Sequence, residues 1–262
     1  MKVFYSALLV SLCLWSCSNK ETKTVKKHTK EVMEKPMAKS YPTAINNVFE
    51  AHGGMEKWNS FSTLTYKMGD SEPLEKQTVD LKSRKIRIEK DKFNIGFDGT
   101  DVWVEALDTN TYKGDARFYH NLYFYFFAMP FVLGDDGISY EETTPLTIDS
   151  VEYPGIKISY GNGVGDSPED NYFLYYHPET KQATWLGYTV TYFEKKKSEE
   201  IHYLHFENWK EVNGVSLPNV LHWYTLDENK MNKKSRGKVS FSEISLSPTL
   251  LPDSLFHNPN KS

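Results

Sequence analysis

Residues 117–133 read RFYHNLYFYFFAMPFVL, a run that holds eight aromatic residues and a single charged one. The run is longer than an ordinary strand, and Pro130 would interrupt a central strand of a sheet. We therefore expect a helix over residues 116–128, ending before Pro130 because the residue that precedes a proline avoids helical geometry. A helix that is apolar on nearly every side must be covered by protein, by lipid or by a ligand.

Most segments after Phe61 alternate between apolar and polar residues with a period of two. In KIRIE at residues 85–89, the isoleucines share one face and the charged residues share the other. Similar alternation occurs at residues 102–104, 156–160, 172–176, 186–192, 201–206 and 220–225. In residues 186–192 the apolar face would hold Leu186 and Tyr188, with Thr189 and Thr191 opposite. Such alternation predicts strands with one buried face.

Turn residues separate the predicted strands at Asp98-Gly99, at Asn213-Gly214 and along residues 161–170. This pattern predicts a mainly β domain, in which a long antiparallel meander curls into an open sheet or partial barrel. The domain opens with a helical stripe that ends at Gly53-Gly54. We find no internal repeat and no break in composition, so residues 41–262 are expected to form a single domain.

The first 16 residues have the form of a secretory signal peptide, with Lys2 followed by an apolar run over residues 3–15. That run is shorter than the roughly 20 residues that span a bilayer. Residues 14–17, LWSC, resemble the lipobox of bacterial lipoproteins, whose cysteine is acylated and becomes the first residue of the mature chain. Cys17 is therefore the predicted lipidation site, and an ordinary signal peptide that happens to contain Cys17 is the alternative.

The chain has 2 cysteines, Cys13 and Cys17, so the mature domain would hold none. This excludes a disulfide framework, a thiol nucleophile and a thiolate metal site from the domain. Residues 18–40 contain seven lysines and three glutamates. We expect this segment to be a disordered tether, serving either as a solvated spacer or as a contact for anionic lipid headgroups.

The charge balance reverses beyond the tether. The whole chain has 31 basic and 35 acidic residues. Subtracting Lys2, the seven tether lysines and the three tether glutamates leaves 23 basic and 32 acidic residues in the domain. A domain with a net charge near −9 is a poor candidate for binding nucleic acid, because phosphate contacts rest on clustered lysine and arginine.

Motifs for catalysis, metals and cofactors are missing from the sequence. There is no G-x-S-x-G and no H-E-x-x-H. His202 and His205 lie three apart on a predicted strand, face opposite sides and cannot share a metal ion. The glycine-rich residues 161–165 are followed by carboxylates that would repel phosphate, and they match no EF-hand loop. We expect no cofactor, no metal site and no catalysis, although carboxylate-based glycosidase chemistry leaves no motif to find.

Four stretches are distinctive when taken together: HGGMEKW at 52–58, RFYHNLYFYFFAMPFVLGDDG at 117–137, GVGDSPEDNYFLYYHPET at 163–180 and EVNGVSLPNVLHWY at 211–224. They resemble an uncharacterised family of bacterial lipoproteins, and the resemblance spans residues 41–256. At the level of the fold, the layout is similar to the LolA/LolB/LppX group. That resemblance implies an unclosed antiparallel half-barrel whose concave face is covered by helices, with acyl chains or lipids held between them.

Together these observations predict a lipid-anchored, periplasm-facing binding protein that holds a lipid or acyl chain between a curved sheet and residues 118–131. Ser18 is not the aspartate that commonly retains lipoproteins at the inner membrane, so the outer membrane is favoured. Burial of apolar surface would drive binding at about 25 cal/mol per Å². The predicted lining consists of Phe118, Tyr123, Phe124, Phe127, Met129 and Phe131, with Trp103 and Trp185 opposite them.

Three alternatives remain open at this point. The aromatic helix could simply complete the core and leave no cavity. With 6 Trp and 17 Tyr, the chain could instead be a carbohydrate-active hydrolase or a sugar-binding accessory lipoprotein. That function would need a polar cleft with paired carboxylates between aromatic faces. The third alternative is an envelope assembly factor whose exposed edge strand binds a protein partner.

Overall fold

A computed structural model of the chain describes residues 39–109, 112–161, 169–193, 198–227 and 233–261. Residues 40–262 form one compact unit. The predicted signal peptide, Cys17 and nearly all of the tether lie outside the described residues, as do residues 162–168 of the glycine-rich stretch.

The helices of this unit are α1 (Thr43–Ala51), α2 (Met55–Asn59) and α3 (Ala116–Phe127), with 3₁₀ turns η1 (Phe131–Gly134) and η2 (Asp253–Phe256). The strands are β1 (Thr63–Met68), β2 (Glu75–Asp80), β3 (Ile86–Glu89), β4 (Phe93–Phe97), β5 (Val102–Ala106), β6 (Ile138–Ile148), β7 (Val151–Tyr160), β8 (Tyr172–Tyr176), β9 (Ala183–Tyr188), β10 (His202–Val212), β11 (Val215–Leu226) and β12 (Lys233–Ser247). The predicted helix over residues 116–128 is confirmed, as is the helix that ends at Gly53-Gly54.

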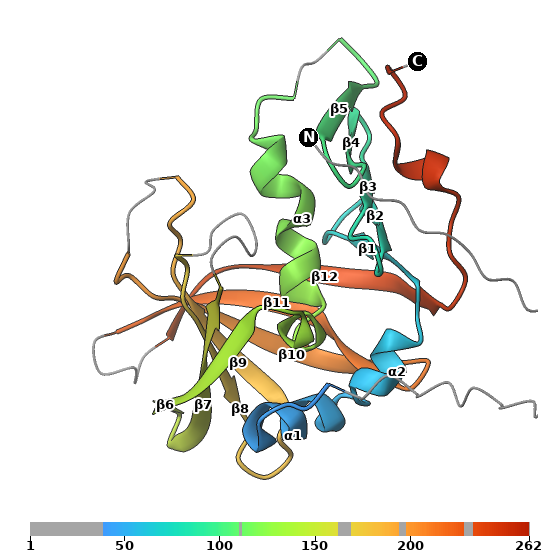
Figure 1. Cartoon of the computed structure of the whole chain (residues 1–262). Coiled ribbons are helices and arrows are strands. Elements are labelled where there is room, and N and C mark those ends of the chain that lie inside the picture. The colour runs from blue at the N-terminus through green and yellow to red at the C-terminus, as the bar shows by residue number, and fades with distance from the viewer. Residues whose placement is uncertain (1–38, 110–111, 162–168, 194–197, 228–232, 262) are drawn as a thin grey trace, which may run out of the picture. The chain divides into compact units, whose positions relative to one another are not determined.

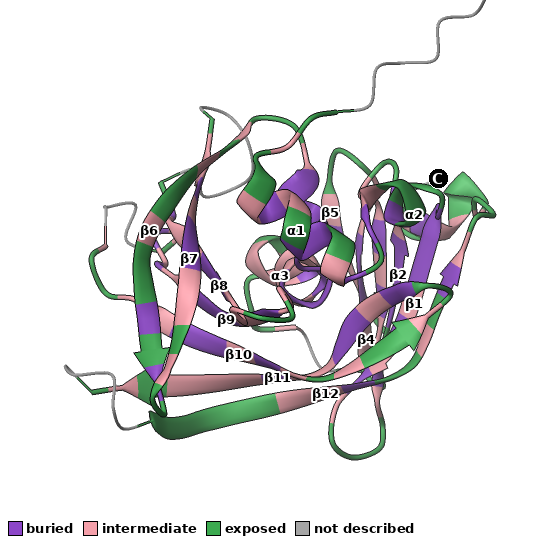
Figure 2. Ribbon diagram, turned by 90° about the horizontal axis from the view of Figure 1, so that it is seen from below, coloured by how far each residue is buried: buried purple, intermediate pink, exposed green. Residues whose placement is uncertain are grey.

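The described strands form one sheet in the order β5-β4-β3-β2-β1-β12-β11-β10-β9-β8-β7-β6, and every neighbouring pair is antiparallel (Figure 1). The sheet does not close, because β5 and β6 are its two outer strands. It is strongly curved, and the helices lie inside the curve (Figure 2). The predicted mainly β architecture, an unclosed antiparallel half-barrel, is therefore confirmed.

The connection between the two meanders explains where α3 lies. Strands β1–β5 follow one another along one half of the sheet, and β6–β12 follow one another along the other half. The chain must cross from the outer strand β5 to the outer strand β6, and α3 with η1 makes that crossing over the concave face (Figure 2). Strand β12 then returns to pair with β1, where Leu64 lies opposite Leu246.

The main core fills the space between the helices and the concave face. Its buried residues come from α1, α3, η1 and the inward positions of most strands, and they include Phe49, Leu64, Ile88, Phe127 and Leu221. The apolar stripe of α1 supplies Ile45, Val48 and Phe49, as its helical spacing predicts. Apolar residues that are far apart in the sequence, such as Phe49 and Leu221, thus belong to one core.

A second, smaller apolar cluster lies on the convex face of the sheet. It consists of Leu146, Ile148, Tyr175, Trp185 and Tyr203. Each of the last three is next in sequence to a leucine of the main core: Leu174, Leu186 and Leu204. Because successive side chains of a strand point to opposite faces, these three neighbours must lie on the convex side.

Local sequence explains several of the boundaries. The carboxylate of Asp115 accepts a hydrogen bond of 3.0 Å from the backbone N–H of Phe118 and so caps the start of α3. The hairpin between β10 and β11 turns at Asn213-Gly214, where φ is 53° and 85°. Two positive φ angles are what a tight hairpin turn requires, and asparagine followed by glycine adopts them readily.

One predicted strand ends earlier than expected. Strand β9 stops at Tyr188, and it is Thr189 and Thr191 that are buried beyond it, so the predicted alternation through residue 192 is wrong there. The hydroxyl oxygen of Thr189 accepts a hydrogen bond from the backbone of Asn171, and the backbone of Thr191 donates to the Asp170 carboxylate. These bonds join the two threonines to residues 170 and 171, and they satisfy polar groups that are buried there.

Candidate functional site

Four of the six predicted lining residues between positions 118 and 131 are fully buried. Phe124, Phe127, Met129 and Phe131 are each at most 1% exposed and belong to the main core. The ring of Phe127 stacks on Phe241 with centroids 4.4 Å apart, and Phe131 stacks on Trp58 at 4.6 Å. Protein atoms therefore already cover this side of the helix, as the core-completing alternative predicted.

Two other predicted lining residues remain partly exposed. Phe118 lies at the start of α3 and packs against Tyr192 and Phe193, the latter being 64% exposed. Tyr123 lies near the middle of α3 and meets the ring of Trp223 edge to face at 6.4 Å.

Neither predicted tryptophan lies opposite α3, so that placement is wrong for both. Trp185 belongs to the convex cluster, where it contacts His205 at a ring distance of 4.3 Å. Trp103 alternates with Val102 and Val104, which pack on the main core, and therefore points to the other face of β5. Its indole N–H donates a 2.8 Å hydrogen bond to the carbonyl of Phe256. The period of two was present in the sequence, but it does not say which face is concave.

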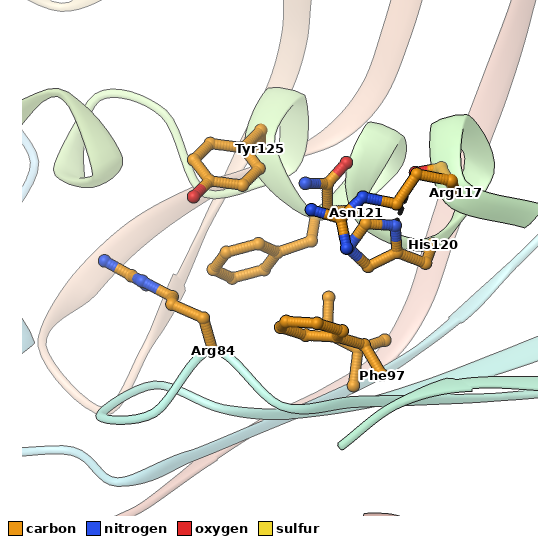
Figure 3. A pocket seen from close by; sticks show the side chains of 8 residues that line it. Arg84, Phe97, Arg117, His120, Asn121 and Tyr125 are labelled. Atoms are coloured by element: carbon orange, nitrogen blue, oxygen red, sulfur yellow. Dashed lines mark hydrogen bonds between the residues drawn. The ribbon is translucent and has the colours of Figure 1, made fainter. Parts of the chain in front are cut away.

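A pocket of about 160 Å³ lies between α3 and the β3–β4 part of the sheet (Figure 3). Its floor is apolar, with Ile86, Phe97 and Phe124, while the groups around it are polar. The pocket is lined by Arg84, Ile86, Phe97, Arg117, His120, Asn121, Phe124 and Tyr125. Arg84 lies on one side of it, and Arg117 with His120 lies on the opposite side (Figure 3).

The helix supplies five of these eight lining residues from one face. Positions 117, 120, 121, 124 and 125 follow the three- and four-residue spacing that brings side chains together on a helix. The aromatic run predicts a helix that is apolar on nearly every side, and this expectation missed the polar stripe. The spacing of Arg117, His120 and Asn121 within the aromatic run was the signal that could have revealed it.

The cationic groups of the pocket are held in place by their neighbours. Nη2 of Arg84 donates to both carboxylate oxygens of Asp135, at 2.5 and 2.7 Å. The guanidinium of Arg84 lies 5.4 Å from the ring centre of Phe124, and that of Arg117 lies 5.5 Å from the ring centre of Phe97. Such cation–π contacts favour a fixed position of the guanidinium.

The hydrogen bonding of two lining residues, His120 and Arg84, indicates what kind of ligand the pocket could bind. Nδ1 of the buried His120 donates a hydrogen bond of 2.6 Å to the carbonyl of Arg117, which fixes the orientation of the imidazole. Nη1 of Arg84 is buried, and the described residues supply no acceptor for it. A buried guanidinium N–H without an acceptor is costly, and it is a ready donor to an anion.

An aromatic row crosses the other half of the concave face. We use this name for Tyr160, Tyr172, Tyr188 and Trp223, which lie on β7, β8, β9 and β11, are partly exposed, and pack against the main core. Ring centres are 5.5 Å apart for Tyr160 and Tyr172, and 6.4 Å apart for Tyr172 and Tyr188. The indole N–H of Trp223 donates a 3.0 Å hydrogen bond to the hydroxyl of Tyr188.

Tyr125 of α3 links the aromatic row to the pocket. It lines the pocket, and its phenol lies close enough to Tyr160 and Tyr172 to act on both electrostatically. Burial is the main cause that raises the pKa of each of those two tyrosines, and the neighbouring phenol of Tyr125 contributes in both cases. The phenols of Tyr160 and Tyr172 are therefore neutral at physiological pH and present an apolar ring with a polar tip.

A polar cluster on the convex face contains a serine, a histidine and a glutamate in contact with one another, an arrangement that hydrolytic triads also show. The Ser235 hydroxyl lies 2.8 Å from Nε2 of His222, and Nδ1 of His222 lies 3.1 Å from Oε1 of Glu207. However, the hydroxyl of Tyr224 lies 2.9 Å from the same Nδ1. The Glu207 oxygen is also shared with Nδ1 of His205, at 3.0 Å. Because both groups compete at the atoms that would orient a catalytic base, we regard the cluster as a polar cover for Trp185.

No group of three or more histidine, cysteine, aspartate or glutamate side chains in the described ranges is placed to hold a metal ion. Among the described helices, none has both the length and the apolar character needed to cross a membrane.

No known protein family matches the sequence, and no curated protein matches it. Solved structures with a similar path of the chain include a DUF1329 family protein from Desulfovibrio piger ATCC 29098, with a TM-score of 0.45 and 8% identity over 82% of this chain and 95% of that one. A LolA superfamily protein from Nitrosomonas europaea has a TM-score of 0.40 and 11% identity, over 80% and 96% of the two chains. A putative outer membrane lipoprotein-sorting protein domain from Vibrio parahaemolyticus has a TM-score of 0.40 and 6% identity, over 80% and 96%. These similarities concern the fold, and no activity is transferred from them.

Proposed function

We propose that this chain is a lipid-anchored binding protein of the cell envelope that holds an apolar or amphiphilic ligand against the concave face of its sheet. The observation that carries the proposal is the aromatic row, whose four residues are partly exposed and pack against the main core. Partly exposed aromatic surface inside a concave face gains free energy when a ligand covers it, at about 25 cal/mol per Å².

The proposed lining differs from the one expected from the sequence. Phe118 and Tyr123 remain in it because they are partly exposed, and Tyr125 with the aromatic row replaces the fully buried members of α3. A ligand in this position would contact phenol hydroxyls as well as ring faces. It would therefore suit a molecule with an apolar chain and at least one polar group.

Tryptophan fluorescence tests this proposal, because Trp223 belongs to the aromatic row while Trp185 lies on the convex face. We expect decanoate, added to the chain starting at Ser18, to change the tryptophan emission in a saturable way. The Trp223→Phe variant should lose most of that change, and the matched Trp185→Phe variant should keep it. A change that survives Trp223→Phe but not Trp185→Phe, or no saturable binding at all, would overturn the proposal.

We further propose that Cys17 carries the lipid and that residues 18–40 are the tether between the membrane and the domain. The support comes from the lipobox-like residues 14–17 and from the lysine-rich composition of the tether. Metabolic labelling with a radioactive fatty acid should mark the wild-type chain and not the Cys17→Ser variant. Fractionation of the two membranes would then test the outer-membrane location, and equal labelling of both chains would refute the anchor.

The two other candidate functions gain no support from the described site. A carbohydrate-active hydrolase needs paired carboxylates, and the eight described residues that line the pocket include none. An assembly factor that binds by strand addition needs an outer strand whose backbone N–H and C=O groups are free to pair. The outer strand β6 carries exposed Glu141, Glu142 and Pro145, features that typically protect an edge from pairing.

A further inference from the structure

We infer that the ligand of this domain is anionic, and that its carboxylate or phosphate group binds in the pocket between Arg84 and Arg117. This inference rests on the proposed function and deepens it, because it names the chemical class of the ligand. The chain of the amphiphile would then lie along the aromatic row.

Arg84 carries a buried N–H group that the described residues leave unmatched. One side of this guanidinium is bound to Asp135, while Nη1 is buried and finds no acceptor among the described residues. Arginine presents its N–H groups in a planar fork that matches a carboxylate or phosphate. Because Arg84 lines the pocket, a small shift of its guanidinium would offer this unmatched N–H to an anion bound there.

The charged side chains that line the pocket are cationic. Two guanidinium groups lie on opposite sides of the pocket, and none of its eight described lining residues carries a negative charge. The side-chain amide of Asn121 and the hydroxyl of Tyr125 add two neutral hydrogen-bonding groups. Between them the floor of Ile86, Phe97 and Phe124 lowers the local polarity, which strengthens an electrostatic contact.

The volume of the pocket suits a headgroup. At about 160 Å³ the pocket is smaller than the range of about 300–1,000 Å³ that is typical of sites for whole drug-sized ligands. It therefore has room for a headgroup and not for a long chain. Tyr125 places the pocket next to Tyr160 and Tyr172, so the remainder of an amphiphile would pass directly onto the aromatic row.

The test compares two ligands that share a ten-carbon chain, decanoate and decanol, by titration calorimetry on the chain starting at Ser18. We expect decanoate to bind about tenfold more tightly than decanol, the ratio typical of one added charge-assisted hydrogen bond. Arg84→Gln should remove most of that preference. Arg87→Gln is the matched control, because Arg87 lies beside Trp103 on the opposite face of β3 and does not line the pocket.

A second pocket variant, Arg117→Gln, protects the test against a folding defect in Arg84→Gln. Thermal unfolding of each variant shows whether the fold is kept, and loss of the preference in either folded variant supports the site. Equal binding of decanoate and decanol, unchanged by both variants, would overturn the headgroup site and leave the carrier intact. Failure of both ligands to bind would overturn the carrier as well. Inorganic phosphate or acetate that binds as tightly as decanoate would show a site for a free anion and refute the amphiphile.

Discussion

The phenol of Tyr119 donates a hydrogen bond of 2.7 Å to Oε2 of Glu75, and this bond joins α3 to the start of β2. Glu75 is only 5% exposed, yet its carboxylate is fully partnered. Lys90 reaches the same oxygen at 2.7 Å, and the side chain of Gln77 donates to the other oxygen at 2.5 Å. Burial first, and then the Glu75 charge, raise the pKa of Tyr119 well above its usual value, so the phenol keeps its proton and donates.

Removal of this hydroxyl should destabilise the fold. Tyr119→Phe leaves the buried carboxylate of Glu75 short of one donor, and we expect the free energy of unfolding to fall by about 1–3 kcal/mol. The control is Tyr123→Phe on the same helix, because only burial and the charge of Glu75, and no hydrogen bond, raise the pKa of the Tyr123 phenol. Urea denaturation would measure the free energy of unfolding of both variants, provided that their m-values equal that of the wild type. Equal losses in the two variants would contradict the role of the Glu75 contact.

Acid should weaken the fold through His52. This side chain is 1% exposed and donates from Nδ1 to the Val48 carbonyl, and burial lowers its pKa to about 4 from a usual 6.5. Between those two pH values the unfolded chain binds a proton that the folded chain does not. The contribution of His52 is therefore fully present above pH 6.5 and falls by about 3 kcal/mol as the pH drops to 4.

The His52→Gln variant isolates this effect, because glutamine does not titrate. We expect its free energy of unfolding to depend less steeply on pH between 6.5 and 4 than that of the wild type. Parallel slopes for the wild type and His52→Gln would show that His52 is not the titrating group.

The contact of β4 with Trp103 should make Gly96 intolerant of a side chain. Gly96 and Trp103 are partners in the β4–β5 ladder, and a Cβ atom on Gly96 would lie 2.1 Å from the indole ring. We expect Gly96→Ala to cost about 1–3 kcal/mol of stability. In a Trp103→Ala background the same change should cost at least about 0.5 kcal/mol less, because the clashing ring is gone. Purely additive losses in this double-mutant cycle would refute the clash.

The deeply buried side of α3 should matter for stability and not for binding. Phe127 is fully buried against Tyr66 and Phe241, so Phe127→Ala should cost about 3–5 kcal/mol through the cavity that it leaves. Phe118→Ala, at a partly exposed position, should cost much less. If folded Phe127→Ala lost decanoate binding while Phe118→Ala and Trp223→Phe kept it, the ligand would lie on the other side of the helix.

The sequence by itself determined the kinds of element and their local boundaries. The aromatic run ending before Pro130 predicted α3, the alternating segments predicted the strands, and Asn213-Gly214 predicted the β10–β11 hairpin. These signals are local, since a helix, a strand or a turn depends on residues that are neighbours in the chain. The resemblance of the whole layout then pointed to an open half-barrel, which the order of the strands confirms.

Only the tertiary structure decided which face of each element met which partner. A period of two separates Trp185 from Leu186 but does not say which of them faces the helix. Pairing of β12 with β1 and the crossing of α3 between the outer strands made one face concave, and both Trp185 and Trp103 fell on the other. The pocket could not be predicted from the sequence for the same reason. Arg84 precedes Arg117 by 33 positions in the sequence, and only packing of α3 against β3 and β4 brings the two guanidinium groups to one cavity.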